Sequence, residues 1–275
     1  MAKIAVFDSG IGSLSIIGVI QDITKAEIIY FADQANFPYG TKSRKELGDI
    51  IDRTIQGLQD KFAPDVIVMA SNTPSLILGE INGIIGVHPP IYEVATYSKT
   101  NNIAILGTKI AVNSNELDSY IISQNIPRDT IIHKIDSSEL VELVETGLFL
   151  TDKNACKDKI RHTLKSIFEK NHIDAATLSS THLPFLAPLL KSEFPSVIFF
   201  DPAESVATKI VKRIANMTGD DTGHSTRHHA GNSTRHHTGH DTEYIIHAYT
   251  SGDVEKFQQD LTRMGVRCSV NSLTF

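Results

Sequence analysis

The chain of 275 residues lacks the features that mark several protein classes. Its 2 cysteines show no CxxC spacing, which excludes a disulfide framework and a cysteine-based zinc site. No apolar run reaches the roughly 18–20 residues of a membrane helix, and no charged N-terminal region precedes a long apolar stretch. Lys and Arg number 26 against 32 Asp and Glu, so a basic surface for nucleic acid is not expected. We expect a soluble, cytoplasmic protein that binds neither nucleic acid nor membranes.

The chain does have an ordinary apolar fraction of 41%, enough for a packed core in one large unit or in two domains. Short apolar runs alternate with helix-period stretches, which predicts an α/β protein with mostly parallel sheets. The clearest helix is expected over 151–170, with Thr151 or Asp152 as its cap. The expected strands cover residues 4–7, 28–31, 66–69, 103–106, 131–132, 175–178 and 197–200.

Two pairs of segments in the chain resemble one another. Residues 65–74 resemble residues 174–183 at an offset of 109, and residues 4–10 resemble residues 103–109 at an offset of 99. Each segment is an apolar strand followed by small polar residues, and ligands of open α/β sheets bind beyond the carboxyl ends of the strands. The echo predicts two similar halves that face each other across one cleft. Chance similarity between Val- and Ile-rich strands is the simpler alternative.

Residues 216–242 depart from this pattern. They contain six histidines, few aliphatic residues and a repeat every eight positions. A segment this polar cannot bury itself, so we expect a disordered insert between a helix that ends near Ala215 and a strand that starts near Tyr244. The histidines could hold Zn²⁺ or Ni²⁺ loosely. A low-complexity expansion without a role is the simpler interpretation, and we predict no metal site.

Four polar clusters lie at the ends of expected strands. They are Asp8-Ser9-Gly10, Pro38-Tyr39-Gly40-Thr41, Ser71-Asn72-Thr73 and Ser180-Thr181-His182. Their hydroxyls, amides and backbone N–H groups suit a small ligand that carries carboxylate and ammonium groups, and Asp8 could meet the ammonium. Taken singly, each cluster is more simply a helix cap. Taken together, in two matching halves, the clusters favour a binding site.

The same residues, in this order, resemble the glutamate racemases of the aspartate/glutamate racemase superfamily. The likeness covers the whole chain except the histidine-rich insert. It is carried by Phe-Asp-Ser-Gly-Ile-Gly at 7–12, Asp-Gln-Ala-Asn-Phe-Pro-Tyr-Gly-Thr at 33–41, Ala-Ser-Asn-Thr at 70–73 and Ser-Thr-His-Leu-Pro at 180–184. Weaker pieces lie at 86–87, 106–108, 143–147 and 249–253, and at Phe257.

The resemblance implies two flavodoxin-like, three-layer domains that are pseudo-symmetric about an interdomain cleft. Residues 1–97 and 205–275 would form the first domain, and residues 98–204 the second, inserted into the first. It also implies an amino-acid racemase that needs no cofactor, including pyridoxal phosphate, and interconverts L- and D-glutamate or aspartate. A homodimer is left open.

In that family, a cysteine on each side of the substrate works on the α-carbon: one thiolate removes the proton and the opposite thiol returns one. The resemblance places these two positions at Ser71 and Ser180. It implies that Asp8 assists the first, and that Glu145 and His182 assist the second. The implied substrate contacts are Ser9, Pro38, Tyr39, Gly40, Asn72, Thr73, Thr108 and Thr181.

Both implied catalytic positions therefore carry a hydroxyl instead of a thiol. A thiol ionises near pKa ~8.5, whereas an alcohol behaves more like bulk water at about 15–16. The gap of ~7 corresponds to roughly 9–10 kcal/mol for forming the anion, of which a neighbouring base can offset a part. We expect racemisation of the two-thiol kind to be lost. The alternatives are a catalytically inactive diacid-binding or regulatory protein, or a lyase or hydrolase that uses Ser180, His182 and Glu145. Cys156 and Cys268 lie outside the motifs, and we expect them to be packing residues.

Overall fold

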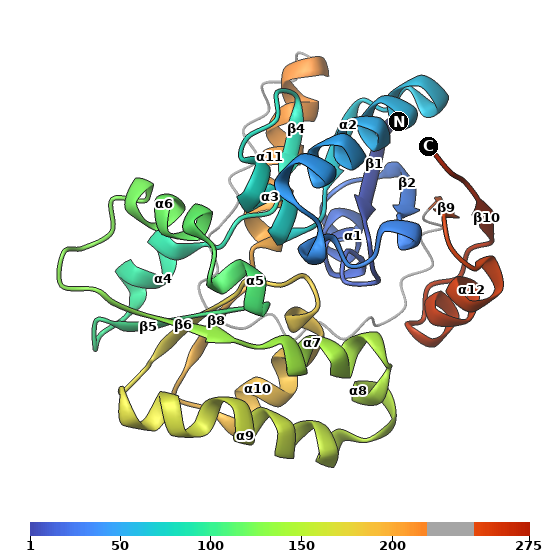
Figure 1. Ribbon diagram of the computed structural model, residues 1–275. Coiled ribbons are helices and arrows are strands. Elements are labelled where there is room, and N and C mark those ends of the chain that lie inside the picture. Colours follow the sequence, from blue (N-terminus) through green and yellow to red (C-terminus); the bar gives the residue numbers. More distant parts are fainter. Residues whose placement is uncertain (219–244) are drawn as a thin grey trace.

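The computed structural model describes residues 1–218 and 245–275, which form two β-sheets with helices packed around them (Figure 1). The first sheet contains β1 (Ala2–Asp8), β2 (Ala26–Ala32), β3 (Val66–Met69), β4 (Ile84–Gly86), β9 (Ile246–Thr250) and β10 (Val270–Ser272). The second contains β5 (Asn102–Gly107), β6 (Ile131–Asp136), β7 (Ala175–Leu178) and β8 (Ile198–Phe200). All eight strand pairs of the described residues are parallel, which confirms the predicted α/β class.

The two sheets share one strand order. The first runs β10-β9-β2-β1-β3-β4 and the second β6-β5-β7-β8, so the last four strands of the first sheet match the whole of the second. The sequence echo follows this match, because it pairs β1 with β5 and β3 with β7. The two aspartates that the echo pairs also make similar hydrogen bonds. An Asp65 carboxylate oxygen accepts the N–H of Lys3 at 2.8 Å, and an Asp174 oxygen accepts the N–H of Lys99 at 2.7 Å. The echo is therefore structural and not a chance similarity.

Twelve α-helices connect and cover the strands in the described residues. They are α1 (Leu14–Ile23), α2 (Arg44–Phe62), α3 (Asn72–Leu78), α4 (Ile91–Tyr97), α5 (Lys109–Val112), α6 (Asn115–Ser123), α7 (Ser138–Glu145), α8 (Leu148–Thr151), α9 (Lys153–Lys170), α10 (Ala187–Glu193), α11 (Ala203–Thr218) and α12 (Val254–Arg263). None of the described helices has the length and hydropathy needed to span a membrane.

The predicted helix over 151–170 is present as α9, which begins at Lys153. Of the two proposed caps, Asp152 is the one used: its carboxylate accepts the N–H groups of Asn154 and Ala155 at 3.1 and 2.9 Å. This cap also separates α9 from the short α8. The predicted apolar face is buried through Ile160 and its neighbours one and two turns later.

The prediction of strands succeeded for every apolar run that was singled out. All seven expected strands are present, and the strand expected near Tyr244 begins at Ile246. The three-residue strands β4 and β10 were not anticipated. The helix expected to end near Ala215 continues to Thr218, and the rest of the predicted insert, with its six histidines, lies outside the described residues.

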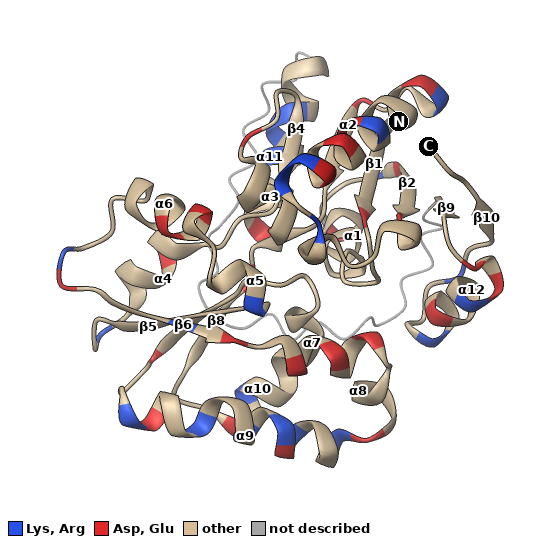
Figure 2. Cartoon of the chain, viewed as in Figure 1, with Lys and Arg blue, Asp and Glu red and all other residues tan. Residues whose placement is uncertain are grey.

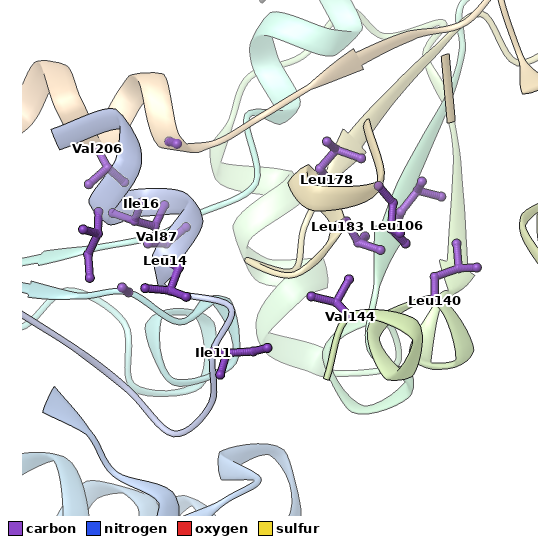
Figure 3. Packing of buried hydrophobic residues seen from close by; sticks show 14 of the residues in the cluster. Ile11, Leu14, Ile16, Val87, Leu106, Leu140, Val144, Leu178, Leu183 and Val206 are labelled. Carbon is purple, nitrogen blue, oxygen red and sulfur yellow. The ribbon is translucent and has the colours of Figure 1, made fainter. Parts of the chain in front are cut away.

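One apolar core runs through both sheets. It includes Ile4 of β1 and Leu106 of β5, and both are fully buried. Figure 3 shows how the halves meet: Ile11, in the loop after β1, lies between the residues of α1 and those of α7, with Val144 nearby. The first sheet takes strands from both ends of the chain and the second from its middle. The domain boundaries at 97/98 and 204/205 stay a prediction.

We expect Ile4→Ala to lower the free energy of unfolding by about 2–5 kcal/mol, because Ile4 is fully buried and β1 lies between two paired strands. Ile122→Ala is the matched control, since Ile122 is 79% exposed, and it should change the free energy by less than about 0.5 kcal/mol. Urea unfolding at one pH measures both. Equal losses for the two variants would contradict the placement of β1 at the centre of the core.

Candidate active site between the two sheets

Asp8 connects three of the polar clusters. It ends β1 and is 3% exposed, and one carboxylate oxygen accepts the N–H of Ser9 at 2.7 Å. The other oxygen accepts the hydroxyl of Thr181 at 3.5 Å, from the loop after β7. The side chain of Ser71, directly before α3, lies close enough to Asp8 to lower the pKa of its carboxyl. The structure thus brings the clusters at Asp8, Ser71 and Ser180 together, across the boundary between the sheets.

The Asp8 carboxyl titrates far from its ordinary value. Burial raises its pKa to about 7, and the charge of Glu145 acts in the same direction. The charge of His182, the hydrogen bond from Ser9 and the nearby Ser71 side chain oppose the effect of burial. A carboxyl with a pKa close to neutrality can both take up and release a proton under physiological conditions, which suits acid–base chemistry.

A second chain of side chains begins at Ser180. Its hydroxyl lies 3.3 Å from Nδ1 of His182, and Nε2 of His182 hydrogen-bonds a carboxylate oxygen of Glu145, the last residue of α7. Because an ionised carboxylate can only accept, Nε2 carries a proton. When Nδ1 carries none, it can accept the Ser180 hydroxyl. The Ser180 hydroxyl, the His182 imidazole and the Glu145 carboxylate thus form a chain of hydrogen bonds in this order.

Glu145 is held in its ionised form. Burial by itself would raise the pKa of its carboxyl, but the hydrogen bond and charge of His182 lower it below the ordinary value. The N–H of Ile11, which donates to Glu145 Oε1 at 3.4 Å, and the charge of Lys256 act in the same direction as His182. Glu145 therefore contacts groups of both halves of the molecule.

Two glycines after β1 allow this approach. A Cβ atom on Gly10 would lie 2.5 Å from the Glu145 oxygen, and one on Gly12 would lie 2.4 Å from the Thr181 hydroxyl and 2.6 Å from the His182 ring. Any larger residue would push the two halves apart. The Gly-Ile-Gly sequence is too short for a dinucleotide fingerprint, and the structure gives it a different role, the close packing of two domains.

The side chain of Asn72 is buried in the site but makes no hydrogen bond. Asn72 starts α3 next to Ser71 and is 4% exposed, yet neither its amide nitrogen nor its amide oxygen has a partner. A buried, unsatisfied polar group costs about 1–3 kcal/mol. Such a group in a native structure calls for an explanation, and a ligand that supplies the missing partners is one.

Some predicted contact residues use their side chains for structure. The Tyr39 hydroxyl donates to Asp33 at 3.1 Å, and the Thr108 hydroxyl accepts the N–H of Ala111 at 3.4 Å and caps α5. The Pro38 carbonyl accepts the N–H of Thr41 at 3.2 Å. For Tyr39 this leaves the backbone, not the side chain, to face a ligand, and for Thr108 the simpler cap interpretation describes the observed contact.

The remaining predicted contacts border the domain boundary. A Cβ atom on Gly40 would lie 3.8 Å from the Thr73 methyl group and 3.5 Å from the side chain of Ile110 on α5. Segments of the first half thus meet α5 of the second. Ile110, which is 43% exposed, was not anticipated as a neighbour of the site, because an isolated Ile in an amphipathic stretch carries no signal of its own.

Asp33 was also missed. It is 2% exposed and accepts hydrogen bonds from Asn36, from Tyr39 and from Ser251, the last at 2.9 Å. These bonds fasten the loop over residues 33–41 to the loop after β9. A signal was available, since Asp33 lies two residues after an expected strand, much as Asp8 follows another.

Neither cysteine takes part in the site. Cys156 is buried in the apolar core of α9, and Cys268 packs against that core. Burial raises the pKa of both thiols, which makes them poor nucleophiles. Both observations agree with the expected packing role. Among residues 1–218 and 245–275, no group of His, Cys, Asp and Glu side chains is arranged to hold a metal ion.

A cavity of about 170 Å³ lies elsewhere, between residues 86–93 and the start of α11. Its wall includes His88, Tyr120 and Lys209, and none of the predicted site residues lines it. Size alone would favour this cavity as a binding site. The perturbed pKa of Asp8, the unsatisfied Asn72 and the chain from Ser180 to Glu145 favour the contact between the sheets.

No family model matches the chain. The similar sequences and the similar solved structures are both glutamate racemases. The glutamate racemase of Sphingopyxis alaskensis is 31% identical over 228 residues, which cover 79% of this chain and 82% of that protein. Among solved structures, glutamate racemase RacE1 of Bacillus anthracis has a TM-score of 0.76 at 21% identity and covers 100% of this chain and 98% of that one. The Francisella tularensis glutamate racemase in complex with D-glutamate has a TM-score of 0.73 at 23% identity, with 99% and 97% covered.

The raised pKa of Asp8 predicts a pH-dependent stability. From its ordinary value of 3.8 up to about 7, the folded state binds a proton that the unfolded state has lost. Stability therefore falls as pH rises through this window, by up to about 1.4 kcal/mol for each pH unit. Asp8→Asn removes this titrating carboxyl. The stability of the variant relative to the unmodified protein should therefore increase from pH 4.5 to pH 7. Urea unfolding at both pH values measures it.

Asp22→Asn is the control for this measurement, because Asp22 lies exposed near the end of α1. It should show no such gain. A difference between Asp8→Asn and the unmodified protein that stays constant with pH, or that shrinks as pH rises, would contradict the burial of an ionisable Asp8.

Proposed function

The chain belongs to the glutamate racemase family, and we propose that it holds glutamate or a related acidic amino acid between its two sheets and transfers the proton on the α-carbon. The ligand would lie between Ser71 and Ser180, the positions that the family resemblance assigns to the two proton-transferring groups. The D-glutamate held by the Francisella tularensis relative belongs to the same ligand class.

Asn72 carries the binding part of the proposal. Its amide is buried next to Ser71 and has both a donor and an acceptor without partners. An α-amino acid offers the complementary pair, a carboxylate for the amide nitrogen and an ammonium for the amide oxygen. Asp8, one strand away in the same sheet, supplies the negative charge that an ammonium group needs. An amide kept unsatisfied in the free protein would thus be satisfied in the complex.

The two sides of the ligand would meet different proton carriers. On one side Ser71 lies beside Asp8 and lowers its pKa, and on the other Ser180 contacts His182, which is held by Glu145. Each serine has a titratable partner, so a proton could pass from the α-carbon through the hydroxyl to Asp8 or His182. A hydroxyl relay lacks the acidity of a thiol, and the transfer should be far slower than in a two-thiol site.

The domain boundaries at 97/98 and 204/205 and independence from pyridoxal phosphate are proposed on the resemblance alone. A cytoplasmic location is proposed from the sequence features described above. The resemblance leaves open whether the chain forms a homodimer.

Asn72→Leu tests the binding claim with two opposite effects. The leucine has a similar volume and no polar atoms, so it should stabilise the protein, by up to about 1–3 kcal/mol. It should also weaken L-glutamate binding about 10- to 100-fold, the equivalent of one hydrogen bond to a charged group. Thermal unfolding and isothermal titration calorimetry measure the two. Asn115→Leu, at an exposed position of α6, should leave binding unchanged. Equal affinity of Asn72→Leu and the unmodified protein would remove the basis of the proposal.

Replacing both serines by cysteine tests the chemistry. The double variant Ser71→Cys, Ser180→Cys should convert L- to D-glutamate at least ~100-fold faster than the unmodified chain, a small part of the ~7 decades in anion population. Each single variant should stay slow, because one face would still lack a thiol. Chiral chromatography after incubation with L-glutamate gives the rates. If the unmodified chain matches the double variant, the acidity argument fails. A silent double variant, together with hydrolysis of glutamate esters by the unmodified chain, would favour the hydrolase alternative.

A further inference from the structure

The end of α7 that carries Glu145 has no cation of its own. The charged residues of α7 are Glu139, Glu142 and Glu145, and the last turn contains no basic residue (Figure 2). A helix C-terminus carries a negative partial charge, so a carboxylate there is placed unfavourably. Helices α2, α9 and α12 each place a Lys or Arg in their own last turn, whereas α1 and α11, like α7, do not. For α7, the stabilising charge has to come from elsewhere.

Arg263 supplies this charge from the other half of the molecule. It is the last residue of α12, which packs against β10 of the first sheet, whereas α7 follows β6 of the second (Figure 1). One guanidinium nitrogen donates to the carbonyl oxygen of Thr146, the residue after α7, at 3.1 Å. The other guanidinium nitrogen pairs with the carboxylate of Asp260, one turn earlier on α12. The two donor nitrogens of Arg263, called its fork below, therefore connect α12 to the residue next to Glu145.

The backbone between α7 and α8 is shaped to receive the guanidinium. Gly147 has φ +74°, a conformation that other residues adopt with strain, and a Cβ atom there would lie 2.2 Å from the Arg263 nitrogen. Ile11, Val144 and Met264 surround the same narrow gap, so the Arg263 side chain is bordered by apolar groups. Glycine at this position removes the side chain that would otherwise exclude the arginine.

Charges of α12 act on the site as well as on each other. Lys256 lowers the pKa of Glu145, and the charge of Glu145 adds to the effect of burial in raising the pKa of Asp260. Arg263 and Lys256 lower the pKa of Asp260 in turn. Charged groups of α12 are therefore coupled to the carboxylate that holds His182.

We propose that Arg263 is a positioning residue, which ties α12 to the C-terminal end of α7 and so holds the Glu145 carboxylate against His182. Two donors in fixed directions are needed, one for the Thr146 carbonyl and one for Asp260. The planar guanidinium provides them, whereas a lysine ammonium provides a point charge on a shorter reach. The catalytic meaning of this tie rests on the function proposed above, but the tie itself can be tested without any ligand.

The test measures the titration of Glu145 by carboxyl carbon NMR, with its signal identified by its loss in Glu145→Gln. Arg263→Lys keeps the positive charge and removes the fork, whereas Arg263→Gln removes both. If Arg263 positions Glu145, both variants weaken the hydrogen bond to His182, and the titration midpoint of Glu145 rises by about 1 pH unit in each. The titratable or donor groups that interact with Glu145 are His182 and Asp8, the N–H of Ile11, Tyr30, and Lys256 and Asp260 of α12.

Arg267→Gln is the matched control, since Arg267 is exposed, lies four residues after Arg263, and makes no ion pair in the part of the chain that the structure describes. It should leave the midpoint unchanged. A native midpoint in folded Arg263→Lys would overturn the proposal, because charge alone would then account for any effect of Arg263→Gln. A native midpoint in Arg263→Gln would overturn it as well.

Gly147→Ala covers the case in which the Arg263 variants do not fold. It keeps every charge and places a methyl group where the guanidinium lies, so the Glu145 midpoint should again rise. An unchanged midpoint in this variant would contradict the tie. None of these titrations requires free glutamate as a ligand. A failure of the proposed function would therefore appear separately: the protein would not bind glutamate, although the Glu145 midpoint would still respond to the Arg263 variants.

Discussion

The close contact between the loop after β1 and the polar groups of the second half is the constraint on which the site depends. Gly10 and Gly12 let this loop approach Glu145, Thr181 and His182 to distances that a single Cβ atom would prevent. The apolar core then closes around the contact, since Ile11 packs towards α7 (Figure 3). Two sheets of the same strand order thereby present their carboxyl ends to one another, which is where parallel sheets bind ligands.

That contact also sets the electrostatics of the site. Asp8 is buried deeply enough to titrate near neutrality, whereas Glu145, which is partly buried, stays ionised because His182 and Ile11 bond its carboxylate. Environments that move two carboxyl groups in opposite directions are typical of acid–base sites. The hydroxyls of Ser71 and Ser180 each touch one of these systems. The chemistry of this family member would therefore lie in the partners of the serines, because the hydroxyls themselves are weak acids.

The sequence predicted the parts of this arrangement that repeat or that follow a strand. Asp8, Ser71 and Ser180 were found because each stands near the end of an apolar run, and the echo between the halves placed Ser71 and Ser180 in equivalent positions. The cap Asp152 was found from its place before a helix. Contacts between distant segments could not be predicted in this way. Arg263 and Thr146 are 117 positions apart, and nothing in either segment shows that they meet. The missing partners of Asn72 likewise appear only when its surroundings are known.

A crystal structure with L-glutamate or D-glutamate tests the central claim most directly, because the claim is one of position. The account predicts the α-carbon between the hydroxyls of Ser71 and Ser180, with the Asn72 amide bonded to the ligand and the Asp8 carboxylate facing its ammonium group. Glutamate bound instead in the cavity beside His88 and Tyr120 would contradict the account. So would Ser71 and Ser180 pointing into separate cavities.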